Sequence, residues 1–179
     1  AVEGGHTVAV GYDGRLSSVE LEATLSAGLA ACGLIVLRVG LGPTPMLYFA
    51  AHTLQTDAGV MITGSHNPPE YNGVKLLWEN GSFYGEDIQR LGRVAASGDF
   101  VTGLGKQISR SVSENYIKRL LEDFNGDKPL AVAWDAGNGA AGKVLKELVG
   151  GLAGRHLLLN ETIDGTFPAH HPDPSVEKN

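Results

Sequence analysis

A serine, a histidine, an asparagine and a lysine lie close together in residues 63–75, which have the sequence TGSHNPPEYNGVK. The hydroxyl of Ser65 is a potential nucleophile, and His66 and Asn67 add polar side chains directly after it. Two prolines then restrict the backbone, so the serine is held by a stiff segment. Lys75 adds a positive charge ten residues after the serine. Together these groups suit the binding or transfer of a phosphoryl group.

The position of this loop, directly after a predicted strand at residues 58–63, favours a role in ligand binding. In open α/β sheets, ligands bind beyond the carboxyl ends of the strands. A serine-hydrolase site is not expected, because adjacent Ser65 and His66 point apart in an extended chain and no G-x-S-x-G turn is present. Arg15, in the turn after the first predicted strand, is expected near the same edge. There it either pairs with Asp13 or helps to bind phosphate.

The elements around the loop alternate between strand and helix patterns, which predicts an α/β fold. Strands are predicted at residues 6–10, 34–39, 58–63 and 74–78, and helices begin near Ser17, Thr44 and Glu86. The connection after Lys75 is too short for a parallel crossover, so we expect a mixed sheet. The first helix starts with a capping-box pattern, Ser17-x-x-Glu20. Its buried face is predicted to contain Leu21, Leu25, Leu29 and Cys32.

A second unit follows residues 97–107, which contain several glycines, show no periodic pattern and are interpreted as a linker. Its first helix begins near a second capping-box pattern, Ser111-x-x-Glu114. Strands are predicted at residues 130–134 and 156–159, with a helix between them. So few strands do not make a covered sheet. We therefore expect one three-layer α/β/α domain with a mixed sheet, followed by the first part of a second, similar domain.

The second unit contains a competing motif, because residues 137–142 (GNGAAG) match the G-x-G-x-x-G pattern between a strand and a helix. Glu161 follows at the spacing typical of a dinucleotide-binding site. The alternative function is therefore a dinucleotide-binding module. A P-loop is not expected, because Val144 has no hydroxyl to bind Mg²⁺. His170, His171 and Asp173 are interpreted as structural, since adjacent histidines seldom chelate one metal ion.

The composition excludes several classes of protein. The chain of 179 residues has 14 basic and 20 acidic residues and no Lys/Arg run, so we expect no nucleic-acid partner. The longest nearly unbroken apolar stretch, residues 27–37, is shorter than the roughly 20 residues that a membrane-spanning helix needs. No membrane partner is expected. The single cysteine, Cys32, permits no internal disulfide, which fits a cytoplasmic protein.

Residues 63–75 resemble the active-site serine loop of the α-D-phosphohexomutases, and in particular that of the bacterial phosphomannomutase/phosphoglucomutases. The resemblance extends over most of the chain. Residues 8–17, 42–48, 132–142 and 164–174 are all similar to segments of this family, in the family's order. The match of residues 137–142 to a glycine-rich turn of the family's second domain favours the mutase over the dinucleotide-binding module.

The resemblance implies a phosphoenzyme that moves a phosphoryl group between the 1- and 6-positions of mannose or glucose phosphates. Ser65 would carry the phosphoryl group, and a hexose 1,6-bisphosphate would be the intermediate and activator. His66 and Asn67 would line the phosphate site, and Lys75 would contact the phosphoserine and assist proton transfer. Mg²⁺ would bind to Ser65 through a phosphate oxygen. The expected partners are small hexose phosphates, and the expected state is a monomer or weak dimer.

Several segments of the family are not found in this sequence. These are the substrate-facing Tyr, Asp and Arg segment expected before Ala1, the Asp-Gly-Asp-Gly-Asp-Arg metal loop, the Glu-x-Ser-Gly sugar loop and the C-terminal phosphate-binding domain. We therefore expect residues 1–108 to be the first domain without its start, and residues 109–179 to be a truncated second domain. The other Mg²⁺ ligands would lie outside this chain, and the fragment alone would be inactive. A phosphoglucosamine mutase is the alternative within the family.

Overall fold

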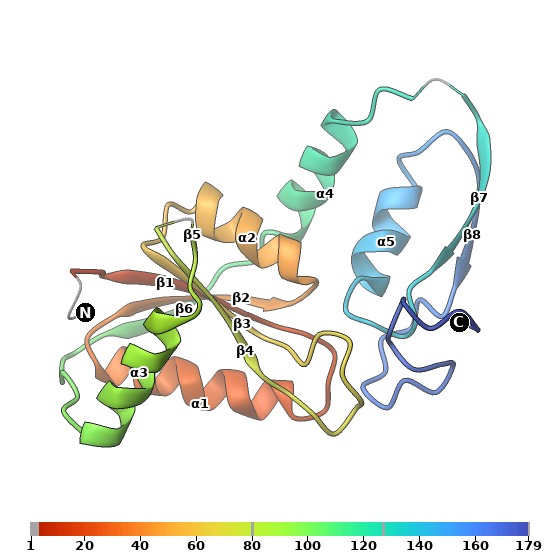
Figure 1. Ribbon diagram of the computed structural model, residues 1–179. Helices are drawn as coiled ribbons and strands as arrows, with labels where there is room; N and C mark the ends of the chain where they lie inside the picture. Colours follow the sequence, from red (N-terminus) through yellow and green to blue (C-terminus); the bar gives the residue numbers. More distant parts are fainter. Residues whose placement is uncertain (1–3, 80, 127, 179) are drawn as a thin grey trace.

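The computed structural model describes residues 4–79, 81–126 and 128–178, which form two α/β units connected by helix α4 (Ser113–Glu122) (Figure 1). The first unit contains β1 (Thr7–Tyr12), α1 (Ser18–Ala31), β2 (Ile35–Leu41), α2 (Thr44–Thr53), β3 (Ala58–Ile62), β4 (Val74–Trp78), β5 (Gly81–Ser82), α3 (Glu86–Ser97) and β6 (Lys106–Ser109). The second unit contains β7 (Leu130–Asp135), α5 (Gly142–Val149) and β8 (Gly154–Leu159). The predicted α/β fold class is confirmed.

The large sheet has six strands in the order β5-β4-β3-β1-β2-β6. Strands β1, β2, β3 and β6 are parallel, whereas β4 is antiparallel to both β3 and β5. The expected mixed sheet is therefore confirmed. The register pairs Tyr12 of β1 with Ile62 of β3, so the turn after β1 and the loop after β3 leave the sheet side by side. We call residues 63–73, which connect β3 to β4 and include Ser65, the serine loop.

The large sheet is covered by α2 on one face and by α1 on the other (Figure 1). The α2 side buries Ala9, Val39, Met46, Leu47, Ala50, Ala51 and Met61. The α1 side buries Val8, Val10, Val36, Val60 and Ile62. Alternate residues of β1 and β3 therefore enter opposite cores, as expected for strands covered on both faces.

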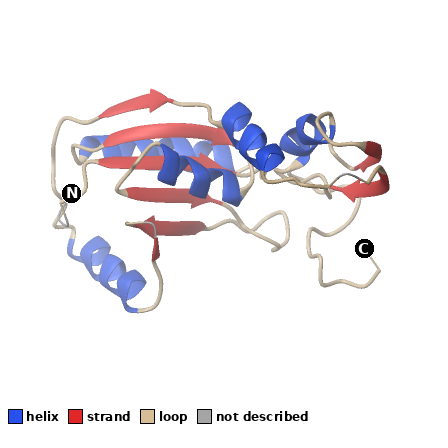
Figure 2. Ribbon diagram, turned by 90° about the horizontal axis from the view of Figure 1, so that it is seen from above, coloured by secondary structure: helices blue, strands red, loops and turns tan. Residues whose placement is uncertain are grey.

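Helix α3 and the segment after it differ from the expected arrangement. Helix α3 has no buried residue and lies beyond the β5 edge of the sheet (Figure 2). Residues 106–109 form β6, which pairs in parallel with β2. The end of the predicted linker is therefore an edge strand. The large sheet continues to Ser109, and a domain boundary at residue 108 stays a prediction.

Helix α1 packs Leu25 and Leu29 of its predicted leucine face against the core, but the residues that it buries most fully are polar. Its buried side chains are Ser18, Glu22 and Ser26. Leu21 is 44% exposed, whereas Leu25, Leu29 and Cys32 are partly buried. The reason is a partner on the sheet, because Arg38 of β2 donates to both carboxylate oxygens of Glu22 at 2.8 and 2.5 Å. Burial of a carboxylate requires such a partner.

The two predicted capping boxes do not form. Ser17 has helical backbone angles (φ −78°, ψ −15°) and makes no capping bond, and its hydroxyl accepts a hydrogen bond from Asn72 instead. Helix α4 begins at Ser113, with Val112 at the cap position. Val112 is only 4% exposed, so its packing in the core places the helix start after Ser111. Tertiary contacts therefore override both local capping signals.

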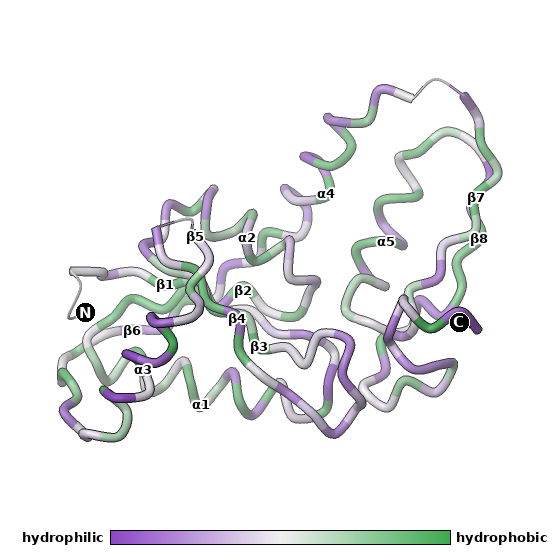
Figure 3. The backbone as a smooth tube through the Cα atoms, in the orientation of Figure 1, coloured by the Kyte–Doolittle hydropathy of each residue, from purple (hydrophilic) through white to green (hydrophobic). Residues whose placement is uncertain are grey.

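The second unit is attached to the first through hydrophobic packing. Strands β7 and β8 form a separate parallel pair. Val112, Ile117 of α4 and Val144 of α5 belong to the same hydrophobic cluster as α2. The apolar character of the central strands β2 and β3 and the hydrophilic character of the serine loop can be followed in Figure 3. Within the described ranges, no helix has both the length and the apolar character needed to cross a membrane.

Candidate active site

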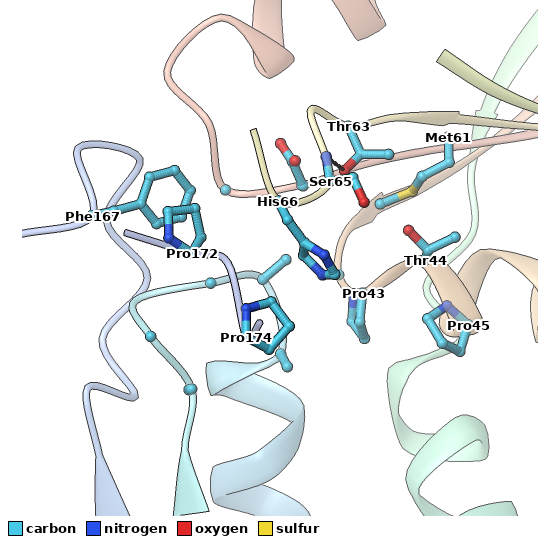
Figure 4. A pocket seen from close by; sticks show the side chains of 18 of the residues that line it. Pro43, Thr44, Pro45, Met61, Thr63, Ser65, His66, Phe167, Pro172 and Pro174 are labelled. Atoms are coloured by element: carbon cyan, nitrogen blue, oxygen red, sulfur yellow. Dashed lines mark hydrogen bonds between the residues drawn. The ribbon is translucent and has the colours of Figure 1, made fainter. Parts of the chain in front are cut away.

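A cleft of about 600 Å³ lies between the serine loop and the second unit. The first unit contributes the turn after β1, the start of α2, the end of β3, the serine loop and Lys75. The second unit contributes the glycine turn after β7 and the C-terminal segment, residues 160–178, of which Phe167, His170 and residues 172–174 line the cleft. Figure 4 shows this arrangement with Ser65 and His66 on one wall and Pro174 on another. Both units are therefore needed to form the cleft.

Ser65 is exposed at the cleft and has a left-handed backbone conformation, with φ of +53°. This conformation is uncommon for residues other than glycine. The backbone N–H of Ser65 donates to the Thr63 hydroxyl at 2.9 Å, and the dashed line in Figure 4 marks this bond. The carbonyl of the same residue accepts a bond from Arg15 at 2.9 Å. The backbone on both sides of the Ser65 Cα atom is thus held in place.

Lys75 lies next to Ser65 because of the antiparallel pairing of β3 and β4. The register places Lys75 opposite Met61, close to the end of β3. The Nζ atom of Lys75 lies 3.4 Å from the Oγ atom of Ser65, a long hydrogen bond. Lys75 is exposed and makes no contribution to either core. Its position fits the charge compensation of an anion on the serine.

His66 and Asn67 differ in their positions relative to the cleft. The imidazole of His66 points into the cleft toward Pro43 and Pro174 (Figure 4). Asn67 is exposed and does not line the cleft, and its carbonyl accepts a hydrogen bond from Arg15. The structure therefore brings Ser65, His66 and Lys75 together at the cleft, whereas Asn67 is not part of the cleft lining.

Arg15 lies beneath the serine loop and does not line the cleft, which bears on the two alternatives considered for it, an internal ion pair and phosphate binding. Its side chain is completely buried, and it is not part of the cleft lining. The terminal nitrogens of the guanidinium donate to four backbone carbonyls of the serine loop. The Nε atom lies 3.3 Å from a carboxylate oxygen of Asp13, so the alternative of an internal ion pair is the one observed.

Several cleft residues were not predicted as site residues. They are Asp13, Pro43, Thr44, Pro45, Tyr48, Asp135, Phe167, His170 and residues 172–174. Most of them lie in residues 42–48, 132–142 and 164–174, which resemble segments of the family. Their resemblance was the available signal, but it gave no indication of which side chains face a common cleft.

The glycine turn at residues 137–142 packs closely on the C-terminal segment. A Cβ atom at Gly142 would lie 1.9 Å from the carbonyl oxygen of Glu161. Asn138 donates to the carbonyl of Thr162 at 2.9 Å. Gly137 has φ of +54° and faces the ring of His170. These contacts account for Gly137 and Gly142 without a bound nucleotide.

His170 and Asp135 form an ion pair at the rim of the cleft, with Nε2 and Oδ2 3.0 Å apart. The backbone carbonyl of His171 and the carboxylate of Asp135 both raise the pKa of His170. Hydrogen bonds from Asn160, Gly137 and His170 lower the pKa of Asp135. Among the described residues, no group of three or more His, Cys, Asp or Glu side chains is arranged to hold a metal ion.

Comparisons with known proteins agree with this geometry. Residues 1–102 match the family described as phosphoglucomutase/phosphomannomutase, alpha/beta/alpha domain I. The chain is 42% identical over 172 residues to a phosphomannomutase/phosphoglucomutase of Pseudomonas aeruginosa, covering 96% of this chain and 37% of that protein. It is 44% identical over 183 residues to a phosphoglucomutase of Neisseria meningitidis, covering 100% of this chain and 40% of that protein.

A solved structure shows the same fold. It is a phosphoglucomutase/phosphomannomutase family protein of Burkholderia thailandensis, with a TM-score of 0.90 and 40% sequence identity. The match covers 97% of this chain and 40% of that protein. The chain therefore spans about 40% of the length of these relatives.

Proposed function

Because this chain belongs to the phosphoglucomutase/phosphomannomutase family, we propose that it carries the phosphoryl-transferring serine of a hexose-phosphate mutase. The observation that supports this proposal is the placement of Ser65. Its hydroxyl is exposed at a cleft, on a backbone held from both sides, with the ammonium of Lys75 at 3.4 Å. A hydroxyl in this environment can carry a phosphoryl group.

In the proposed reaction, the P–O bond of phosphorylated Ser65 breaks as a hydroxyl oxygen of a hexose phosphate forms a new bond to phosphorus. The product is a hexose bisphosphate, and its other phosphate then returns to the serine. The sugar hydroxyl loses its proton and the serine oxygen gains one. Phosphoryl transfer depends mainly on positioning and on the stabilisation of charge.

Lys75 and His66 have separate roles in this proposal. A phosphoserine carries roughly −1.5 to −2 charges, which the adjacent Lys75 ammonium partly compensates. Lys75 is also close enough to Ser65 Oγ to hold a proton at that atom as the phosphoryl group leaves. His66 points into the cleft, where it can hydrogen-bond to a phosphate oxygen. Asn67 does not line the cleft, so this proposal gives it no contact with the phosphate.

Mg²⁺ is the cofactor that membership of this family implies, and it would neutralise charge on the transferring phosphoryl group. The residues present do not by themselves fit a complete metal site, because the described part of the chain contains no cluster of three ligating side chains. A phosphate oxygen on Ser65 would be this chain's contact with the ion. The other ligands would come from outside the chain.

The proposed substrates are small hexose phosphates. Mannose and glucose phosphates are proposed first, because several relatives that match the chain are named as phosphomannomutases or phosphoglucomutases. A glucosamine phosphate is the second candidate, since the chain is also 42% identical to a probable phosphoglucosamine mutase of Methanothermobacter thermautotrophicus. Activity on each sugar phosphate, measured with the full-length protein, separates these possibilities.

The test of the proposed function is to locate the phosphate in the full-length active protein by mass spectrometry of its peptides. We expect phosphate on Ser65 and a loss of nearly all turnover in Ser65→Ala. Ser82→Ala is the matched control, because Ser82 is also exposed but lies on β5, outside the cleft. Phosphate on another serine, with Ser65 unmodified, would overturn the proposal.

A further inference from the structure

The guanidinium of Arg15 is buried under the serine loop, and both of its terminal nitrogens bond to that loop. Its terminal nitrogens donate to the carbonyl oxygens of Ser65 at 2.9 Å, Asn67 at 2.7 Å, Pro68 at 2.5 Å and Tyr71 at 3.0 Å. An arginine has four N–H groups on these two nitrogens, and each of the four carbonyls takes one. The side chain is therefore a template around which residues 65–71 are folded.

This template acts directly on the backbone of the serine. Ser65 has φ of +53°, a conformation that persists in a non-glycine residue only when the surrounding structure holds it. Arg15 binds the carbonyl of Ser65, and the Thr63 hydroxyl binds its N–H. If the carbonyl were released, the peptide plane could rotate and the hydroxyl would change its direction relative to Lys75.

The surroundings of Arg15 hold it in this position. The carboxylate of Asp13 lies 3.3 Å from Nε. Gly64 leaves space for the guanidinium, since a Cβ atom there would lie 2.4 Å from Nε. The ring of Phe167, from the second unit, covers the guanidinium at 5.1 Å from ring centroid to Cζ. Gly165, also from the second unit, packs against the backbone next to Arg15, because a Cβ atom there would lie 2.6 Å from the carbonyl oxygen of Gly14.

We propose that Arg15 is a positioning residue of the phosphoryl transfer: it directs the Ser65 hydroxyl into the cleft by holding the carbonyls of the serine loop, and it does not touch the phosphate. This inference rests on the proposed function of Ser65. A lysine cannot replace the arginine, because a compact ammonium has three donors from one point, whereas the planar guanidinium reaches carbonyls in several directions.

The experiment compares Arg15→Lys with Arg38→Lys in the full-length enzyme. Arg38 is a matched control, because it also forms a fork-like pair, but with Glu22 and away from the cleft lining. We expect Arg15→Lys to lower kcat by about 10²-fold, as a displacement near 1 Å can do. Its KM should change little, because the substrate contacts remain. Arg38→Lys should leave kcat unchanged.

Amide hydrogen exchange of peptides that cover residues 64–73 gives a readout that needs no activity. We expect faster exchange in Arg15→Lys than in the parent, and unchanged exchange in Arg38→Lys. If Arg15→Lys does not fold, Phe167→Leu serves as a milder variant, since it removes the aromatic cover and keeps the arginine. It should show the same changes to a smaller extent.

Two results would overturn the inference. The first is unchanged exchange of the serine loop in the folded Arg15→Lys protein, or in Phe167→Leu where that variant replaces it. The second is an increase in KM with an unchanged kcat, which would identify Arg15 as a substrate-binding residue. A parent enzyme without phosphate on Ser65 would instead contradict the proposed function, and the exchange measurement would still report whether Arg15 holds the loop.

Discussion

The imidazole of His170 joins the C-terminal segment to the end of β7, with Nε2 3.0 Å from the Asp135 carboxylate. Its Nδ1 lies 3.0 Å from the carbonyl of His171. Both ring nitrogens therefore face acceptors, and only the protonated imidazolium can donate to both. Asp135 and His170 also line the cleft, so protonation of this ring strengthens a contact within one cleft wall.

The first prediction concerns stability and pH. The pKa of His170 is raised in the folded protein. Its contribution to the free energy of unfolding is therefore fully present below about pH 6.5, the ordinary histidine pKa, and is lost as the pH rises through the raised pKa. The pKa of Asp135 is lowered, so the stabilisation by the pair is lost at low pH only below about pH 4, where this carboxylate becomes protonated. We expect His170→Asn to lower the free energy of unfolding at pH 5.5 by less than about 1 kcal/mol, because the pair is partly exposed.

Urea denaturation at pH 5.5 and at pH 9 tests this prediction, since the two conditions lie on either side of the titration. His52→Asn is the matched control, because His52 is exposed at the end of α2 and does not line the cleft. An equal loss at both pH values in His170→Asn would mean that the charged pair does not contribute.

The second prediction concerns Gly64, whose missing side chain makes room for Arg15. In Gly64→Ala, the new Cβ would lie 2.4 Å from Arg15 Nε and 2.7 Å from the carbonyl oxygen of Tyr71. We expect a loss of about 1–3 kcal/mol in the free energy of unfolding, typical of overpacking. In Gly28→Ala, on an exposed part of α1 with no atom within 4 Å, we expect a gain of about 0.5–1 kcal/mol. Thermal denaturation of both variants shows whether the loss of stability comes from crowding at Gly64 or from the replacement of any glycine by alanine.

The third prediction concerns Lys75. Because Lys75 is exposed and lies 3.4 Å from Ser65 Oγ, its removal should affect transfer more than folding. We expect Lys75→Met to lower kcat of the full-length enzyme by about 10²- to 10³-fold, with little change in Tm. Lys75→Arg should recover part of the rate, since it restores the charge. A large decrease in Tm with unchanged turnover would instead assign Lys75 a structural role.

The fourth prediction is that the chain does not bind NAD or NADP. The glycine turn packs on residues 160–170, and the carbonyl of Glu161 already lies against Gly142. Calorimetric titration should therefore show no saturable binding tighter than about 100 μM, which corresponds to about −5.5 kcal/mol. Tighter binding that is lost in Gly139→Val would support the dinucleotide-binding alternative.

The main strands, the mixed sheet and the position of the serine loop can all be predicted from the amino-acid sequence. These features depend on local patterns, such as the apolar runs of β1 to β3 and the short connection after Lys75. The proximity of Ser65 and Lys75 follows from the same local information, because two neighbouring antiparallel strands bring residues at the two ends of one loop together.

The identity of the buried polar residues and of the segments that share the cleft depends on long-range contacts, which local sequence patterns do not contain. Arg15 binds carbonyls 50 to 56 residues away, and Glu22 is buried because Arg38 reaches it from β2. His170 meets Asp135 across 35 residues. Hydrophobic periodicity indicates where apolar side chains prefer to lie, but it contains no information on partners for charged groups. A buried charge is stable only beside such a partner, and the folded chain alone brings the two together.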